Sequence, residues 1–127
     1  MADVNQGNRP LSPHLQIYKW PLNMAMSILH RITGAGLGVT GVLVTWWFLA
    51  LAVSPEYFAT ANAVMTSWFG YLVLLLSLVA LWFHFVNGIR HLIWDTGSWF
   101  GKRRVWRSGI GGLIAAAILV VITIIVA

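Results

Sequence analysis

The chain has 127 residues, of which 59% are hydrophobic and 9% are charged, and its formal net charge is +5. A soluble domain carries about 25% charged residues, so this composition excludes one and indicates a single compact integral membrane protein. The sequence contains no cysteine. Disulfides, thiolate metal sites, cysteine-ligated iron–sulfur clusters and c-type haem attachment are therefore excluded within the chain.

Residues 1–20 are predicted to form a cytoplasmic or interfacial segment. Pro10 and Pro13 lie among polar residues, and Tyr18 and Trp20 follow with the amphipathic rings typical of a membrane interface. No early apolar core with a cleavage site is present, so we expect no removable secretory signal. Pro21 fits the first turn of a helix that begins at about this point.

Three uncharged stretches follow, at residues 32–53, 57–89 and 108–127. Each is long enough for a helix across a hydrocarbon core of about 30 Å, which takes about 20 residues. None shows the alternation of a barrel strand. We therefore predict an all-α integral membrane protein, residues 1–127, that forms a single membrane-anchor domain. Its three transmembrane helices are predicted at approximately residues 22–53, 60–93 and 106–127.

The basic residues predict how these helices are oriented. All eight Lys and Arg residues precede the first span, enter it, or lie between the second and third spans, and the loop around Pro55 has none. The positive-inside rule then places the N-terminus on the cytoplasmic or matrix side and the C-terminus on the opposite side. Because these charges flank spans, anionic lipid or a docked partner explains them better than nucleic acid does.

Four glycines of the first span, Gly34, Gly36, Gly38 and Gly41, lie close together. The last three match a dinucleotide-binding pattern by letters, but that fingerprint requires a preceding strand and a turn into a helix. Within a membrane helix, the small residues instead form a face that another helix or a flat cofactor can approach closely. The sequence leaves both of these uses open.

His84 is an imidazole within an uncharged span, where hydrocarbon offers its ring nitrogens no water. Either it donates to a backbone carbonyl of another helix, or it ligates haem iron. Gly88 and His91 share its helical face, and Gly88 could leave room for a porphyrin edge. A second axial ligand is not evident, because His30 lies nearer the surface and His14 lies outside any span. A different polypeptide is therefore expected to supply it.

A second polar cluster is predicted where the first span begins. Ser27 and Arg31 are four residues apart and share a helical face, with His30 beside Arg31. Arg31 is either a lipid-facing residue that sets orientation or part of a site for carbonyl or carboxylate groups. With three acidic residues in the chain, no hydrolytic site is credible. We expect no catalytic residue and no activity from the isolated chain.

Three blocks of sequence resemble a known family, and they occur in the expected order between residues 9 and 95. They are similar to the b556-type cytochrome b subunit, the large membrane anchor, of succinate dehydrogenase (respiratory complex II). The resemblance is strongest to the mitochondrial and related bacterial type. The blocks are Arg9-Pro-Leu-Ser-Pro-His14-Leu, Ser27-Ile-Leu-His30-Arg31-Ile-Thr-Gly34 and His84-x-x-x-Gly88-Ile-Arg90-His91-Leu-Ile-Trp-Asp95.

This resemblance implies a membrane anchor that holds haem b jointly with a second small membrane subunit. The two anchors would attach a flavoprotein and an iron–sulfur protein to the membrane. Succinate would be oxidised at the flavin, and ubiquinone reduced where the anchor meets the iron–sulfur subunit. The expected location is the bacterial inner membrane, or the mitochondrial inner membrane if the protein is organellar. Lipid is an expected partner, and nucleic acid is not.

The resemblance also implies roles for particular residues. Ser27 and Arg31 would bind quinone, His84 would be an axial ligand of the haem iron, and His30 and Arg31 would contact the haem propionates. The second axial histidine would come from the partner membrane subunit. Three alternatives remain: a haem-free anchor, a fumarate reductase working in the opposite direction, and a small transporter subunit that uses His84, Asn87 and Arg31.

Overall fold

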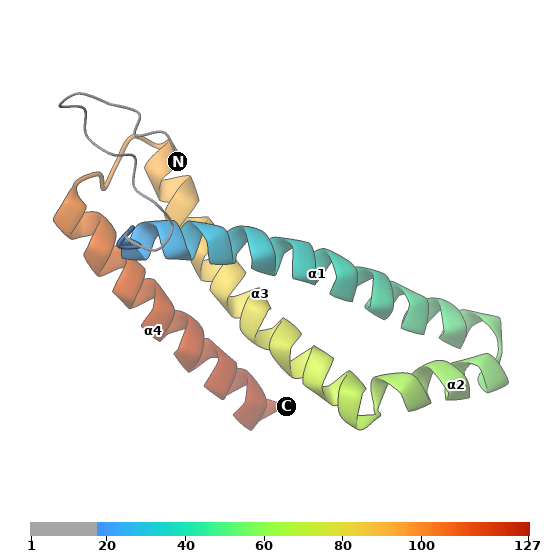
Figure 1. The fold of residues 1–127 in the computed structure, drawn as a ribbon. Helices are drawn as coiled ribbons and strands as arrows, with labels where there is room; N and C mark the ends of the chain where they lie inside the picture. Colours follow the sequence, from blue (N-terminus) through green and yellow to red (C-terminus); the bar gives the residue numbers. More distant parts are fainter. Residues whose placement is uncertain (1–17) are drawn as a thin grey trace, which may run out of the picture.

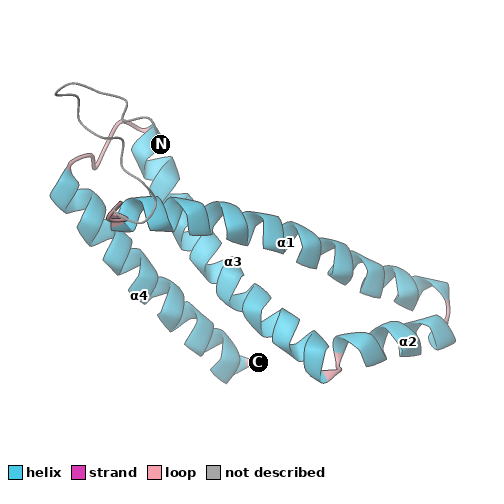
Figure 2. Cartoon of the chain, in the orientation of Figure 1, coloured by secondary structure: helices cyan, strands magenta, loops and turns pink. Residues whose placement is uncertain are grey.

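The structure is a computed structural model that describes residues 18–127. Over this range the chain forms helices joined by short loops, and no strand (Figures 1 and 2). The predictions for Pro10, Pro13 and His14 lie outside the described residues. The helices are α1 (Leu22–Val53), α2 (Pro55–Met65), α3 (Trp68–Asp95) and α4 (Lys102–Val126).

Helices α1, α3 and α4 are long and apolar enough to cross a membrane. Most of their large apolar side chains are exposed, and the buried apolar residues are few and mostly small. This pattern is the reverse of a soluble bundle and suits a protein whose surroundings are lipid or other subunits. The prediction of an all-α membrane protein with three transmembrane helices is confirmed.

Helix α2 was not predicted, because the sequence from residue 57 to residue 89 is continuously uncharged. It begins at Pro55 after an N-cap, Ser54, whose Oγ accepts a hydrogen bond from the Tyr57 backbone N–H at 3.1 Å. Hydrogen bonds with its own backbone and with the Ser54 hydroxyl lower the pKa of Glu56. The carboxylate therefore stands ionised at the positive end of this helix.

The second membrane span accordingly starts later than the predicted residue 60. The chain turns at Thr66 and Ser67, and Ser67 Oγ accepts from the Gly70 backbone N–H at 3.1 Å. A Cβ at Gly70 would collide with the carbonyl oxygens of Val64 and Met65, so this turn requires glycine. The span is α3, which begins after the turn and continues two residues beyond the predicted end at residue 93.

Helix α3 packs against both α1 and α4, and the start of α1, the start of α4 and the end of α3 meet at one end of the bundle (Figure 1). Two polar contacts join the helices deeper in the bundle. Thr40 Oγ1 on α1 lies 2.7 Å from Ser77 Oγ on α3. Trp82 Nε1 on α3 donates to Thr123 Oγ1 on α4 at 2.9 Å.

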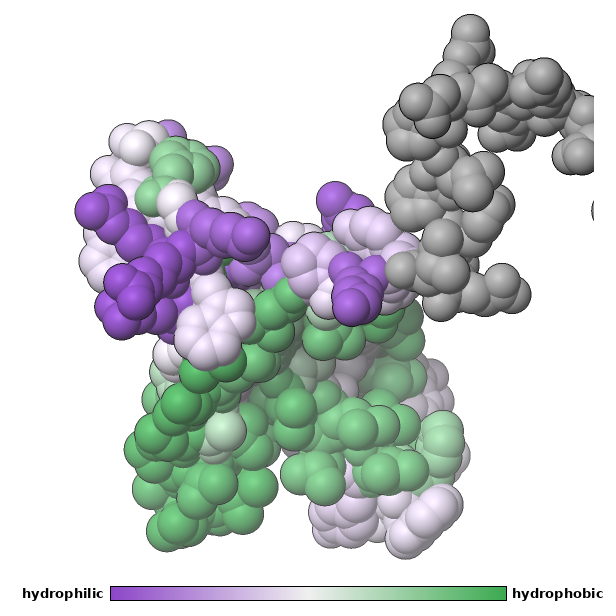
Figure 3. Space-filling view, turned by 60° about the vertical axis from the view of Figure 1, so that its left-hand side comes forward, coloured by the Kyte–Doolittle hydropathy of each residue, from purple (hydrophilic) through white to green (hydrophobic). Residues whose placement is uncertain are grey.

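The end where α1 and α4 begin is the basic end of the protein. Hydrophilic side chains gather there, and apolar side chains cover the helices below it (Figure 3). This boundary is what a membrane interface requires. That the basic end faces the cytoplasm or matrix stays a prediction. Its exposed cations on α4 are Lys102, Arg103, Arg104 and Arg107.

Candidate functional site

His84 lies on α3 and faces the backbone of α1. Its Nδ1 is 3.0 Å from the carbonyl oxygen of His30 and 3.3 Å from Thr33 Oγ1. The Thr33 hydroxyl is itself 2.8 Å from the Leu29 carbonyl oxygen and 3.0 Å from that of His30, so its single proton goes to one of these carbonyls. Thr33 therefore offers His84 a lone pair.

These contacts decide which ring nitrogen of His84 carries the proton. Both groups near Nδ1 are acceptors, so the neutral ring is stable here with its proton on Nδ1. Nε2 then has a lone pair, and the hydrogen bonds of His84 with described residues use Nδ1 only. Metal-ligating imidazoles usually donate their other N–H in this way. The hydrogen bond from His84 to a carbonyl oxygen of a neighbouring helix is thus present, and it leaves the Nε2 lone pair available to ligate a metal.

His30 and His91 form a row of imidazoles with His84. The ring centroids of His30 and His84 are 3.8 Å apart with an angle of 11° between the planes, and those of His30 and His91 are 5.1 Å apart. His30 was expected nearer the surface than His84, but the packing of α1 against α3 brings their rings together. Within residues 18–127 no three or more His, Cys, Asp or Glu side chains are placed so that they could hold a metal ion between them. His30 thus supports the face of the His84 ring.

Glycine at position 34 allows this close packing. A Cβ on Gly34 would lie 2.9 Å from His84 Cε1, a distance that real Cβ atoms essentially never show. A Cβ on Gly88 would meet His30 Cε1 at 3.8 Å, which is ordinary contact. Because His84 and His91 also contact His30, the predicted common face of His84, Gly88 and His91 is confirmed.

The remaining glycines of the run behave differently from Gly34. A Cβ at Gly36, Gly38 or Gly41 would meet no described atom within 4 Å. The run therefore has one position, Gly34, that packs against a side chain of this chain, and three that meet no described atom. Of these three, Gly38 and Gly41 lie on one face of α1, and Gly36 lies on nearly the opposite side. Small residues on an exposed membrane helix allow another helix to approach closely.

Ser27 and Arg31 lie one turn apart at the start of α1, where Ser27 is half-buried and Arg31 is exposed. Neighbouring residues on a helix are rotated by about 100°, so His30, which faces α3, points away from the direction of Arg31. The structure thus places Ser27, His30 and Arg31 in adjoining turns without gathering them into one contact cluster. Arg31 presents its charge outward.

Arg90 is a buried residue that sequence reasoning missed, because it was counted among the charges that flank the spans. Its side chain is only 7% exposed. Nε donates to Ser108 Oγ at 3.0 Å, and Nη1 donates to Asn87 Oδ1 at 3.2 Å. Nη2 donates to the Val105 carbonyl oxygen at 2.9 Å and to Asn23 Oδ1 at 3.4 Å. One guanidinium therefore joins α1, α3 and α4.

Two further contacts complete the surroundings of Arg90. Its Cζ lies 4.1 Å from the ring centroid of Trp94, a cation–π contact, and Nη1 lies 3.9 Å from Met26 Sδ. The spacing of Asn87, Arg90 and Trp94 at three and four residues puts them on one helical face. This spacing was the signal in the sequence that could have identified Arg90 as buried. It indicates a buried cation whose hydrogen-bond donors have partners.

Two buried nitrogen atoms have no hydrogen-bond partner within the described part of the chain. They are His30 Nδ1 and Asn87 Nδ2. Burying a polar group without a partner costs a few kcal/mol, so such atoms are usually satisfied by a ligand, a water or another subunit. The His30 atom belongs to the ring stacked on His84, so the row of imidazoles contains a nitrogen atom that can still form a hydrogen bond.

Comparison with known proteins gives consistent results over nearly the whole chain. A family described as the succinate dehydrogenase/fumarate reductase transmembrane subunit matches residues 5–124. The succinate dehydrogenase cytochrome b556 subunit of Paracoccus denitrificans is 46% identical over 99% of this chain and 97% of its own length. The mitochondrial cytochrome b560 subunit of Mus musculus is 36% identical over 87% and 67%, respectively. The cytochrome b560 subunit of Marchantia polymorpha is 41% identical over 93% and 90%.

Proposed function

This chain belongs to the succinate dehydrogenase/fumarate reductase transmembrane subunit family, and we propose that it holds haem b through His84 and helps to bind ubiquinone through Ser27 and Arg31. It is a membrane subunit of succinate dehydrogenase, so the resemblance found in the sequence is confirmed. Its contribution to the enzyme is to anchor the complex in the membrane.

The observation that carries the haem proposal is the hydrogen bond between His84 Nδ1 and the His30 carbonyl oxygen. It fixes the tautomer and the ring orientation, and it leaves the Nε2 lone pair to ligate iron. The unpartnered His30 Nδ1 supplies a polar atom for a propionate of the same group. When bound, haem b accepts and releases one electron at a time.

The second axial ligand is proposed to come from a second small membrane subunit. His84 would hold the haem iron through Nε2. His30 is stacked on the His84 ring and His91 lies next to His30, so neither is proposed as the second ligand. The open face of α1 at Gly38 and Gly41 offers a surface on which that subunit could pack.

The quinone proposal rests on Ser27 and Arg31 at the start of α1. The Ser27 hydroxyl can donate to a quinone carbonyl oxygen, and the exposed Arg31 guanidinium can stabilise the negative charge that develops as the quinone is reduced. Both lie in the part of α1 that begins at the basic end. We propose that the iron–sulfur subunit docks there, with the flavoprotein beyond it, so that electrons arrive next to these two residues.

Replacing Ser27 with alanine is expected to lower succinate:quinone reductase activity on the order of tenfold to a hundredfold, because a hydrogen bond to the developing charge is lost. Succinate oxidation with a soluble artificial acceptor should be unchanged. The matched control is Thr45→Ala, since Thr45 is exposed on the same helix and bonds the Gly41 carbonyl of its own helix. Equal loss of both activities in the Ser27 variant would count against a quinone role.

Replacing Gly34 with alanine is expected to disturb the His84 ring, because the added methyl would overlap Cε1. Overpacking of this kind costs typically 1–3 kcal/mol, and moving the ring should shift the haem absorption bands or lower haem content per complex. Gly111→Ala is the control, since a Cβ there meets nothing within 4 Å in the described chain. An unchanged spectrum and haem content in the Gly34 variant would mean that the ring packing does not matter for the ligand.

A further inference from the structure

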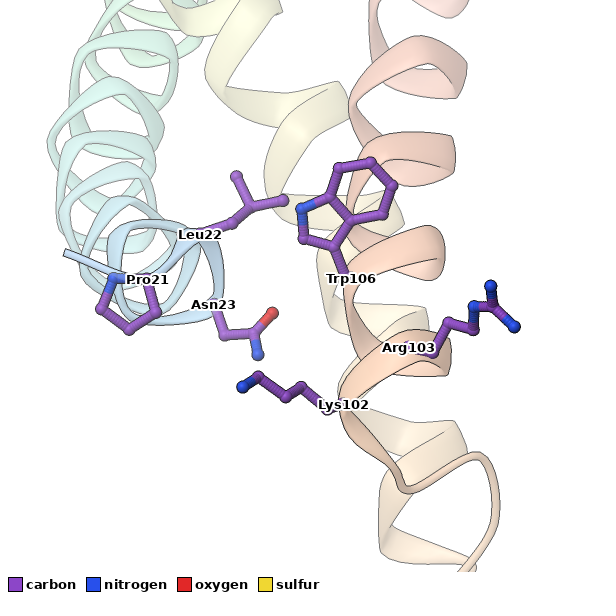
Figure 4. A pocket seen from close by; sticks show the side chains of 6 residues that line it. All are labelled: Pro21, Leu22, Asn23, Lys102, Arg103 and Trp106. Atoms are coloured by element: carbon purple, nitrogen blue, oxygen red, sulfur yellow. The ribbon is translucent and has the colours of Figure 1, made fainter. Parts of the chain in front are cut away.

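A groove lies at the basic end, between the first turns of α1 and α4 (Figure 4). It encloses 430 Å³ and is mostly apolar. None of the residues proposed above for haem or quinone lines it, so it is a separate feature of the protein. Its lining consists of Pro21, Leu22 and Asn23 on the α1 side, and Lys102, Arg103 and Trp106 on the α4 side.

Arg90 determines which side of the Asn23 amide faces this groove. Its Nη2 donates to Asn23 Oδ1 at 3.4 Å, and a guanidinium can only donate. The amide oxygen is therefore turned toward Arg90, and the NH₂ group occupies the other branch of the side chain. In Figure 4 the Lys102 side chain crosses the groove toward α1, and its ammonium group points toward this nitrogen.

The polar atoms presented to the groove are donors. Lys102 has three N–H bonds and no acceptor, and Trp106 has an indole N–H and no acceptor. The Trp106 ring forms one wall, with its nitrogen toward α1, whereas Arg103 points away (Figure 4). An ammonium and an amide NH₂ that face each other are satisfied together by an anionic oxygen placed between them.

Further features of α4 favour an anion at this place. Its first turn contains no acidic residue, and its N-cap, Gly101, provides no side-chain hydrogen bond to the backbone N–H groups there. Positive charge and the helix dipole therefore have the same sign at the groove. The groove also brings charged side chains, Lys102 and Arg103, together with apolar ones, Leu22 and Trp106.

We propose that this groove binds an anionic phospholipid. The headgroup phosphate is held between Lys102 Nζ and Asn23 Nδ2, and the glycerol and upper acyl chains lie against Leu22 and Trp106. An apolar lining beside one cationic and one neutral donor fits a lipid better than free phosphate, which would leave Leu22 and the indole uncovered. The site would attach α1 to α4 through a ligand taken from the membrane.

The test is native mass spectrometry of the whole complex, purified in detergent and titrated with phosphatidylglycerol or, separately, with phosphatidylcholine. Phosphatidylglycerol should bind more tightly, and Lys102→Gln should weaken its binding about fivefold, the effect of one cation near a lipid surface. Arg107→Gln removes the same charge from the same helix outside the groove, and it should leave the affinity within about twofold.

A second variant keeps the proposal testable if Lys102→Gln does not assemble. Asn23→Asp places a carboxylate where the lipid oxygen would lie while still accepting from Arg90, so the complex should assemble and lose the tightly bound lipid. Equal weakening by Lys102→Gln and Arg107→Gln would show diffuse surface attraction and overturn the site. So would displacement of the lipid by millimolar inorganic phosphate, or the absence of bound lipid because another protein segment fills the groove.

Discussion

Replacing His84 with leucine is expected to abolish the low-spin b-type signal in a dithionite-reduced minus oxidised spectrum of the purified complex. Leucine fills much of the space of the ring but has no lone pair for iron. The hydrogen bond to the His30 carbonyl and the stacking against the His30 ring, at 3.8 Å between centroids, would be lost as well. The variant is therefore expected to lose both the ligand to iron and the packing against the His30 ring.

The control for this experiment is His91→Leu, which removes an imidazole from the same row. His91 contacts His30 and Trp94 at 5.1 Å between ring centroids, and we assign it no iron. Its replacement should leave the low-spin signal in place. A normal spectrum in the His84 variant would refute ligation by this residue. The absence of haem from the unmodified complex, with quinone reductase activity intact, would favour the haem-free anchor instead.

Replacing Arg90 with leucine is expected to be the most destabilising single change in the chain. It would leave Asn23 Oδ1 and Asn87 Oδ1 without their donor, together with the contacts to Val105 and Ser108. Arg90 is the charged member of this network, so its removal leaves buried neutral acceptors without a donor, at a cost of about 1–3 kcal/mol each. We therefore expect little assembled complex in membranes, and a large drop in the thermal unfolding midpoint of what does assemble.

Two comparisons separate the network from the charge of Arg90. Arg90→Lys keeps the charge but cannot form the branched set of hydrogen bonds, so its stability should fall between those of the wild type and the leucine variant. Arg104→Leu removes an exposed cation of the basic end, and its effect should stay within about 0.5 kcal/mol. If Arg90→Leu and Arg104→Leu unfold at the same temperature, the buried network contributes nothing measurable.

The sequence was sufficient to predict the membrane-spanning class, because long uncharged stretches have few other structures available to them. It was also sufficient to predict the face that His84 shares with Gly88 and His91, because helical spacing alone decides which residues share a face. Pro21 and the Ser54-Pro55 pair flank α1, which runs from Leu22 to Val53.

The features that could not be predicted from the sequence are those that depend on how the helices pack against one another. The packing of His30 on His84 follows from the approach of α1 to α3, which no periodicity encodes. The burial of Arg90 likewise needs Val105 and Ser108 of α4 beside it. Helix α2 was missed because hydropathy does not detect the turn that separates it from α3. The signals of that turn are a serine N-cap, Ser67, and one glycine, Gly70. The roles of Ser27 and Arg31 stay predictions.

The contact between position 34 and the His84 ring also sets a rule for how this sequence can change over evolutionary time. A side chain larger than hydrogen at position 34 is incompatible with the ring in its present place. A lineage that enlarges residue 34 must therefore move the imidazole or give it up. Among descendants that keep histidine at position 84, glycine at position 34 is expected throughout, and among those that have lost it, position 34 is expected to drift toward alanine and larger residues.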